Sequence, residues 1–294
     1  MRYEKLLSMR FYRVIDGQEL RLFAFLSIIS LVLIWEFIKP KRQLTQSKAN
    51  RWFNNISLVV LDSIVVRLLL PFGTVGVALW AQENEVGLLH HLNLGETLSI
   101  VLAIIILDLI IYWQHRLFHK VPLLWRLHQV HHADRDIDVS TGLRFHPIEI
   151  LLSMLIKFAA VLLLGVPAIA VVLFEVILNG MAMFNHGNIQ LPKALDSILR
   201  LLLVTPDMHR VHHSVLKHET NSNYGFNISL WDKLFGSYLA QPDLGHTQMT
   251  IGLEQYQNES THSILWMLRL PFISSGGNYA QNKHAITGNS TGEN

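Results

Sequence analysis

Eight histidines stand in three closely spaced groups, and two of the groups repeat the pattern HxxHH. Residues three and four apart share one face of a helix, so each group can point its imidazoles in one direction. Imidazole is a ligand for iron, zinc, copper or nickel. An ordinary surface or core role would suit any single histidine but not three such clusters. The groups are HRLFH with His115 and His119, HQVHH with His128, His131 and His132, and HRVHH with His209, His212 and His213.

The number of histidines indicates more than one metal ion. Eight imidazoles exceed the four ligands of a tetrahedral zinc site, so two ions that share the set are the economical count. A non-haem diiron centre is the natural candidate for such a set of imidazoles. The chain has no cysteine, which excludes iron–sulfur clusters, thiolate-ligated haem and disulfides.

Three further polar residues lie where they could assist the clusters. His186, in the turn-like segment FNHGN, is expected to be a ninth ligand. His146, in RFHPIE, could be a ligand, a cap of the following helix or a partner that orients a ligand, and we expect the last. Asp108, seven residues before His115, either accepts a hydrogen bond from a ligand imidazole or pairs with Arg67.

Other polar positions are expected to have structural roles. The remaining charges in the membrane helices, Asp62 and Glu175 among them, are predicted to form structural pairs. The segment from Asn223 to Tyr238, NYGFNISLWDKLFGSY, has no metal-ligand spacing and is predicted to be a short helix with turns that packs Trp231, Leu234 and Phe235 beneath the site.

The composition is that of a membrane protein. Half of the residues are apolar and 16% are charged, against about a quarter in soluble proteins. The apolar residues form five blocks near spanning length, and Gly165 and Pro167 separate the last two as in a helical hairpin. We therefore predict four to five membrane helices. The blocks run from about Leu22 to Ile38, Ile56 to Trp80, Leu98 to Trp113, Ile148 to Leu164 and Ala168 to Phe184.

Charged residues in the connections predict the orientation. The link after the first block carries Lys39, Lys41, Arg42, Lys48 and Arg51 and no acid, whereas the connection from residue 81 to 96 carries three acids and no base. The positive-inside rule places the basic link in the cytoplasm, in a bacterial inner membrane or the endoplasmic reticulum. Alternation then brings all three histidine clusters to that side. The basic amino-terminal stretch argues against this, unless it lies on the membrane as an amphipathic helix or the first block is re-entrant.

These observations predict the whole architecture. We expect an all-α integral membrane bundle with a cytoplasmic, histidine-rich helical cap that holds a dimetal site. Residues 1–95 would form a membrane anchor region, 96–240 a catalytic domain, and 241–294 a carboxy-terminal extension that is disordered from about residue 274. The basic residues form no stripe interleaved with aromatic residues, so nucleic acid is not an expected partner.

The motifs HRLFH, HQVHH, RFHPIE, NHGN, HRVHH and NYG followed by WDKLFGSY, in this order, resemble the fatty acid hydroxylase superfamily, which includes sterol desaturases and sterol methyl oxidases. The resemblance covers roughly residues 95 to 240. It implies a membrane oxidoreductase with a histidine-bound diiron centre that uses dioxygen and two external electrons on a lipid. By this match the eight clustered histidines are the expected ligands, and His186 matches an additional family histidine.

The chain departs from some members of that superfamily, because no HPGG haem segment of a fused cytochrome b5 domain is present. The expected electron donor is therefore a separate protein, such as a cytochrome b5-like protein, a ferredoxin or a reductase. Sterol and fatty acyl substrates both remain open, as do hydroxylation and desaturation. Two other functions compete: a histidine-rich zinc transporter or sensor, and a membrane scaffold that keeps a structural metal site without activity.

Overall fold

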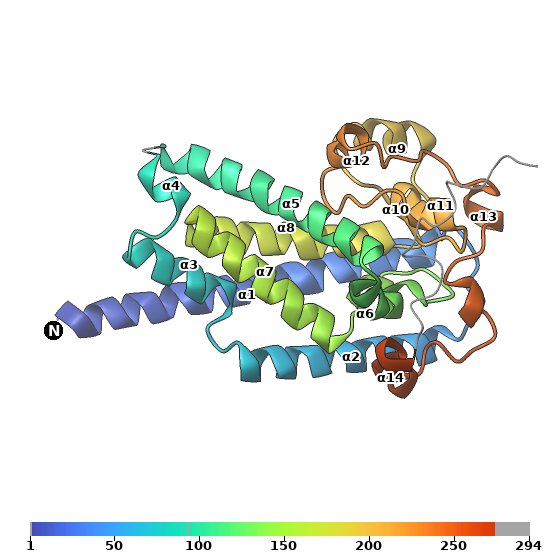
Figure 1. Cartoon of the computed structure of the whole chain (residues 1–294), viewed down its shortest axis with the longest axis horizontal. Coiled ribbons are helices and arrows are strands. Elements are labelled where there is room, and N and C mark those ends of the chain that lie inside the picture. Colours follow the sequence, from blue (N-terminus) through green and yellow to red (C-terminus); the bar gives the residue numbers. More distant parts are fainter. Residues whose placement is uncertain (1, 93, 274–294) are drawn as a thin grey trace, which may run out of the picture.

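The computed structural model describes the backbone of residues 2–92 and 94–273 and, within these ranges, the side chains from residue 19 onward. The described chain is all-α: it contains no β-strand, only three isolated β-bridges between loops. This confirms the predicted fold class (Figure 1). The long helices are α1 (Arg2–Ile38), α2 (Lys48–Leu69), α5 (Glu96–Lys120), α7 (Pro147–Leu164) and α8 (Ala168–His186). The shorter ones are α3 (Gly73–Glu83), α4 (Leu88–His91), α6 (Pro122–His132), α9 (Lys193–Leu199), α10 (Pro206–His212), α11 (Lys217–Thr220), α12 (Leu230–Leu234), α13 (Gly245–Gln248) and α14 (Ile264–Ile273), with 3-10 turns at Thr141–Leu143 and Glu254–Tyr256.

Five segments of the described chain are long and apolar enough to cross a membrane. They run along the long axis of the molecule in Figure 1, and large apolar side chains are exposed on their outer faces. Such faces need lipid around them, so the bundle is that of an integral membrane protein. The segments are Glu19–Ile38, Lys48–His91, Glu96–Lys120, Pro147–Leu164 and Ala168–His186.

The second apolar block differs from its prediction as one helix from Ile56 to Trp80. The structure divides this stretch into α2 and α3, with the break at Leu70 and Pro71. Proline has no backbone N–H to continue the ladder, and its ring clashes with the preceding turn. The two short helices α3 and α4 then return the chain to the start of α5, at the end of the bundle opposite to α6 and α10 (Figure 1).

The hairpin between α7 and α8 forms where it was predicted. Gly165 ends α7 in the left-handed region, with φ of 67°, and Pro167 stands at the N-cap of α8. Gly87 crosses this turn so closely that a Cβ on it would lie 2.1 Å from the Gly165 nitrogen. Because glycine alone lacks that atom, the approach ties the connection between α3 and α4 to the hairpin.

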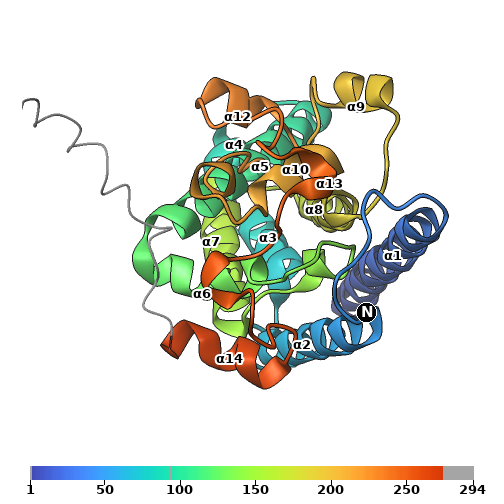
Figure 2. The ribbon, with the colours of Figure 1, turned by 90° about the vertical axis from the view of Figure 1, so that its right-hand side faces the viewer.

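The remaining short helices form a cap at one end of the bundle. Helices α6 and α9 to α14 gather where α5 and α8 end and α7 begins, as the two views show (Figures 1 and 2). Trp125 of α6, Leu58 of α2 and Met267 of α14 are fully buried in one apolar cluster. The region after residue 240 therefore packs onto both α6 and α2. The tail predicted to be disordered from about residue 274 lies outside the described residues.

Candidate metal centre

Nine buried histidines meet at the base of the cap in two adjacent groups, each able to hold a metal ion. In each group, ligand nitrogens from all the members lie within 4.8 Å of one another. The nine are the eight clustered histidines and His186, which ends α8. Group one is His115, His119, His128, His132 and His212, and group two is His131, His186, His209 and His213.

The two HxxHH motifs are divided between the groups, unlike the sequence expectation that each would point one way. His128 and His132, four residues apart, lie on one face of α6 and join group one, whereas His131 joins group two. The second HxxHH motif, HRVHH, is divided in the opposite way: His212 joins group one, and His209 and His213 join group two. Successive helical residues are rotated by about 100°, so one motif can serve two adjacent ions.

The nitrogen spacing fits shared metal ions. The Nε2 atom of His186 lies 2.9 Å from that of His209, 3.1 Å from that of His131 and 3.2 Å from that of His213. In group one the Nε2 atoms of His115 and His212 are 3.0 Å apart. Two metal–nitrogen bonds of about 2.1 Å at a right angle separate their nitrogens by about 3 Å. The imidazoles therefore converge as ligands do.

Several ring nitrogens in group one have no hydrogen-bond partner. The Nε2 atoms of His119, His128 and His132 are buried and unpartnered among the described residues. A buried polar atom without a partner is costly, and a metal ion offers each of these nitrogens a bond. The donor set and the orphaned nitrogens together fit a dimetal centre.

The outer nitrogens of five imidazoles are held by acceptors. Nδ1 of His115, His186 and His212 donates to backbone carbonyls of Tyr224, Ala182 and Ser222 at 2.7–2.8 Å. Nδ1 of His131 donates to the Arg144 carbonyl at 3.3 Å, and Nδ1 of His128 donates to Glu149 at 2.6 Å. These bonds keep the proton on Nδ1 and leave the Nε2 lone pair directed inward, as metal ligation requires.

Burial also keeps the imidazoles neutral. Among the histidines outside the membrane helices, burial lowers the pKa of His128 to about 3. Burial, followed by the neighbouring imidazoles, lowers the pKa of five others well below the ordinary value. Neutral imidazole is the form that binds a metal, so no proton has to leave before binding at neutral pH. The five are His131, His132, His209, His212 and His213.

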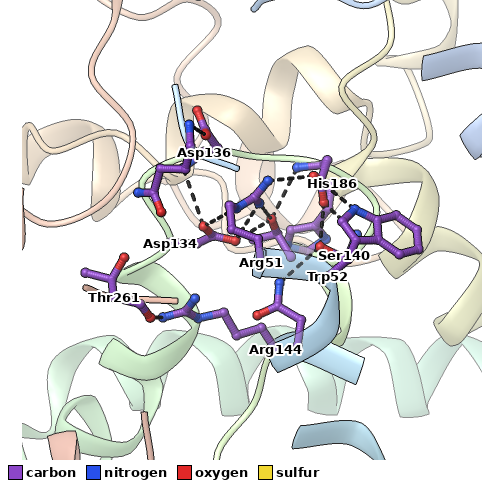
Figure 3. Close-up of polar contacts among 12 residues, drawn as sticks. Arg51, Trp52, Asp134, Asp136, Ser140, Arg144, His186 and Thr261 are labelled. Carbon is purple, nitrogen blue, oxygen red and sulfur yellow. Dashed lines mark hydrogen bonds and ion pairs between the residues drawn. The ribbon is translucent and has the colours of Figure 1, made fainter. Parts of the chain in front are cut away.

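A buried ion-pair network adjoins the histidines, and the sequence did not predict it (Figure 3). Arg51 of α2 makes a two-pronged pair with Asp134 at 2.7 and 2.9 Å and a pair with Asp138 at 2.6 Å. Burial would raise the pKa of Asp134, but Arg51 and Arg144 lower it to about 2. Asp136, between the two, accepts hydrogen bonds from the backbone of residues 45 and 46. The segment after His132 is thereby fixed to α2 and to the link before it.

The segment DRDID, residues 134–138, carries a signal for this network, because it has three acids at every second position and begins two residues after the HQVHH motif ends. Arg51 is one of the bases that follow the first apolar block in the sequence, yet its side chain is fully buried. Sequence spacing cannot show that a base about 85 residues earlier reaches these acids.

Glu149, not His146, contacts a clustered histidine. His146 is the N-cap of α7, where its Nδ1 accepts a hydrogen bond from the Ile148 N–H at 3.2 Å. Its Nε2 lies 3.3 Å from the Leu268 carbonyl. This is the capping role that the sequence left open, and it corrects the expectation that His146 orients a ligand. The following proline starts the helix and brings Glu149, one turn in, to His128.

Asp108 supports the cap rather than a histidine or Arg67. Its carboxylate accepts hydrogen bonds from Asn227 at 2.7 Å, from the Ile228 N–H at 3.2 Å and from the Trp231 indole at 2.8 Å. The expectation that it binds an imidazole is corrected, because residues 227 to 231, in the loop before α12 and in α12 itself, donate to its oxygens. Asp108 therefore positions the loop whose Tyr224 carbonyl holds His115.

The WDKLFG segment forms the short helix α12, as predicted, but only part of it packs inward. Phe235 stacks on Tyr112 with ring centres 5.3 Å apart, whereas Leu234 is 69% exposed. Asp232 accepts from the backbone N–H groups of Tyr224 and Gly225, both at 2.7 Å. The segment thus closes the loop over group one.

A cavity of about 600 Å³ opens beside group one. It lies among α1, α2, α5, α7 and α8, and His115 and His128 form part of its wall. Most of the lining is apolar, including Phe118, Phe145 and Phe226. Its place within apolar helices suits a lipid chain that enters from the bilayer.

His91, His218 and His246 lie away from the two groups. His91 lies on α4 at the opposite end of the bundle. His218 is exposed and lies 3.1 Å from Asp243, with Glu219 beside them. His246 is buried in the cap near Asp207, at 3.7 Å.

The chain resembles known lipid-modifying enzymes. Residues 100–237 match the fatty acid hydroxylase family. Ornithine lipid hydroxylase OlsE of Rhizobium tropici is 27% identical over 77% of this chain and 69% of its own length. Human alkylglycerol monooxygenase is 31% identical over 44% of this chain and 28% of its own length. A putative sterol C5(6)-desaturase of Arabidopsis thaliana is 26% identical over 48% of each chain. No solved structure matches.

The matched residues include all nine histidines of the two groups and end within the segment that closes over group one. The family's relatives are hydroxylases, monooxygenases and desaturases of lipids by their names. Over residues 100–237 the chain is similar to the fatty acid hydroxylase family, and its five apolar helices together with these lipid-modifying relatives indicate a membrane-embedded oxidoreductase.

Proposed function

We propose that this protein is an oxygen-dependent diiron hydroxylase of a membrane lipid. The observation that carries the proposal is the pair of buried histidine groups beside an apolar cavity within the membrane bundle. Hydroxylation is favoured over desaturation because the relative aligned over 77% of this chain is a hydroxylase, whereas the sterol desaturase aligns over 48%.

The nine histidines would hold the two iron ions, five around one and four around the other. Bound iron supplies the oxidising power to break a C–H bond with dioxygen, which no side chain can do. The balance is one lipid C–H, one dioxygen, two electrons and two protons, which give one C–OH and one water. The electrons require a separate donor, such as a cytochrome b5-like protein, a ferredoxin or a reductase.

The protein's own groups would fix the ligands and keep water away. Glu149 and four backbone carbonyls orient imidazoles through Nδ1. Phe145 stacks on His131 with ring centres 4.5 Å apart, and the ring centre of Trp125 lies 4.8 Å from that of His119. A rigid, dry surrounding holds the ligand geometry and suppresses side reactions of activated oxygen.

A zinc transporter fits the geometry less well. A transporter places its ligands along a path near the middle of the membrane. Here both groups lie together at the cap end, where α8 ends at His186 and α10 carries His209 and His212. A scaffold that only retains metal would not need a cavity that reaches the ligands.

We also propose that the cap faces the cytoplasm of a bacterial inner membrane or the endoplasmic reticulum. The support is the basic link from Lys39 to Lys48, which joins α1 to α2 at the cap end. Lys41 of this link binds Asp207 at the start of α10 at 2.5 Å. The link is thus part of the cap and shares its side of the membrane.

The test combines metal analysis with lipid oxidation. We expect about two iron atoms per purified chain, and labelled oxygen from dioxygen in a lipid hydroxyl group when a reductant is supplied. His131→Ala and His212→Ala, one from each group, should each lower the iron content and abolish oxidation. His91→Ala is the matched control, because His91 lies on α4 at the far end of the bundle. Full oxidation by both group variants would refute the proposal.

A further inference from the structure

The cavity beside group one has an acceptor-rich polar wall. Asp62 of α2, Gln114 of α5 and Glu149 of α7 line it together with His115 and His128. Elsewhere its lining includes the apolar side chains of Phe25, Val59, Val66, Met154 and Leu178. A cavity shaped only for hydrocarbon would not include three such acceptors in its lining together with metal ligands.

These three residues each present a buried oxygen without a hydrogen-bond partner among the described residues: Asp62 Oδ1, Gln114 Oε1 and Glu149 Oε2. Gln114 uses its Nε2 to bind Ser153 at 2.9 Å, and Glu149 uses Oε1 to hold His128 at 2.6 Å. The structural pair expected for Asp62 does not form in the described part of the chain, although Asp62 is only 7% exposed. Buried acceptors of this kind indicate a missing donor.

The cations of the same cavity do not supply that donor. Arg21 and Lys157 both bind Glu175, the latter at 3.4 Å. Lys157 lies eight residues after Glu149 on α7, which is about 12 Å along a helix. The positive groups are thus tied to their own carboxylate deeper in the bundle, and the expected structural pairing of Glu175 is found there.

We infer that the cavity binds a lipid whose polar head carries a free primary amine, with Asp62, Gln114 and Glu149 as its acceptors. A protonated amine has three N–H donors and no acceptor, which matches three buried oxygens that lack a donor, two of them carboxylate. The hydrocarbon chain occupies the apolar remainder of the cavity. Because Glu149 also holds His128, the oxidised carbon lies near the amine rather than far along the chain. The inference rests on the proposed lipid hydroxylase function and names its substrate class.

The test is equilibrium binding of three probes with the same chain length, hexadecylamine, hexadecanol and hexadecylglycerol ether, to the purified metal-loaded protein in detergent without reductant. We expect hexadecylamine to bind at least tenfold more tightly than either neutral probe. Asp62→Asn should remove this preference and leave binding of the neutral probes unchanged. Ser63→Ala is the matched control, since Ser63 lines the same cavity from the same helix and bonds only its own helix at Val59.

Equal binding of the amine and the neutral probes by the unaltered protein would overturn the inference without any variant. A preference for the amine that survives in Asp62→Asn would also overturn it. Binding is measured without turnover, so a protein that prefers the amine but oxidises no lipid contradicts the proposed hydroxylase and leaves the amine site standing. Oxidation of lipids together with equal probe binding contradicts the amine site and leaves the hydroxylase standing.

Discussion

Two buried polar clusters adjoin one another at the cap end of the bundle, and they differ in whether their members satisfy one another. In the network around Arg51, Asp134 and Asp138, the guanidinium and both carboxylates are paired within the protein. In the histidine groups, by contrast, inner nitrogens either face one another or lack a partner among the described residues. Both clusters are costly to bury, but only the histidine groups need an added ligand, such as a metal ion, to satisfy their nitrogens. Hydrogen-bond satisfaction therefore distinguishes the structural cluster from the ligand site.

Acid should separate the two clusters most strongly. The six clustered histidines outside the membrane helices have pKa values below 6.5 in the folded protein, so below pH 6.5 protons bind the unfolded chain in preference. The free energy of unfolding of the metal-free protein is therefore highest above pH 6.5. Below that pH it decreases by up to about 1.4 kcal/mol per histidine per pH unit. The pKa of Asp134 is lowered from 3.8 to about 2. The stabilisation that this carboxylate provides is therefore lost only when the pH falls from about 3.8 to about 2.

Thermal unfolding in detergent measures this effect. The measurement runs from about pH 8 to about pH 4, a range that brackets the ordinary pKa of histidine. The loss should begin near pH 6.5 in the metal-free protein and at lower pH in the metal-loaded protein, because bound metal competes with protons. A stability that stays constant down to pH 4 would contradict neutral, buried imidazoles.

Arg51→Met should be the most damaging single substitution in the paired cluster. It leaves Asp134 and Asp138 buried without their cation. Removing one partner of a buried ion pair typically lowers the free energy of unfolding by roughly 3–5 kcal/mol. Denaturant unfolding measures the loss. Lys48→Met, one turn earlier on α2, is the control: Lys48 is 45% exposed and its pair with Glu36 spans 3.4 Å, so the change should be under about 1 kcal/mol. Similar losses for both would mean that burial of the pair is unimportant.

Glu149→Gln should weaken metal binding without unfolding the protein. The charge-assisted bond from His128 to Glu149 fixes the ring and raises its basicity, and losing such a partner typically costs about 10- to 100-fold in metal affinity. Competition with a chelator measures the change. Glu259→Gln is the comparison, because Glu259 is exposed and its carboxylate accepts a hydrogen bond from the Trp266 indole and not from an imidazole. An equal loss of metal affinity in both variants would argue against the specific role of Glu149.

Gly142→Ala should have the smallest effect and should act on group two alone. A Cβ at this position would lie 2.8 Å from the Ala182 carbonyl oxygen and 3.0 Å from Nδ1 of His186, so the imidazole has to shift. Overpacking of this kind costs about 1–3 kcal/mol. Gly95→Ala, where nothing lies within 4 Å of the added atom, should be near neutral. Spectroscopy of the bound metals should show one altered site in Gly142→Ala, and two unaltered sites would refute the steric argument.

Much of the fold could be predicted because it depends on local patterns. Apolar blocks of spanning length indicated the long helices, and Gly165 with Pro167 indicated the turn of the hairpin. Pro71 was the visible signal for the break that the prediction missed. At the site, residue type and spacing identified eight of the nine histidines that the structure brings together, and the position of His186 after the last apolar block indicated the ninth. Their hydrogen-bond partners were predicted poorly: His146 caps a helix and Asp108 holds a loop.

The sequence by itself determined which imidazoles are present and that three and four residue spacings place them on helical faces, because helical periodicity is a local property. Only the tertiary structure decided that His131 and His212 cross to the opposite group from their neighbours, that Glu149 holds His128, and that Arg51 reaches Asp134. It also decided that Asp62 lines a cavity without a partner among the described residues. These contacts join segments that are 13 or more residues apart or depend on how helices pack, and no spacing rule along the chain encodes that.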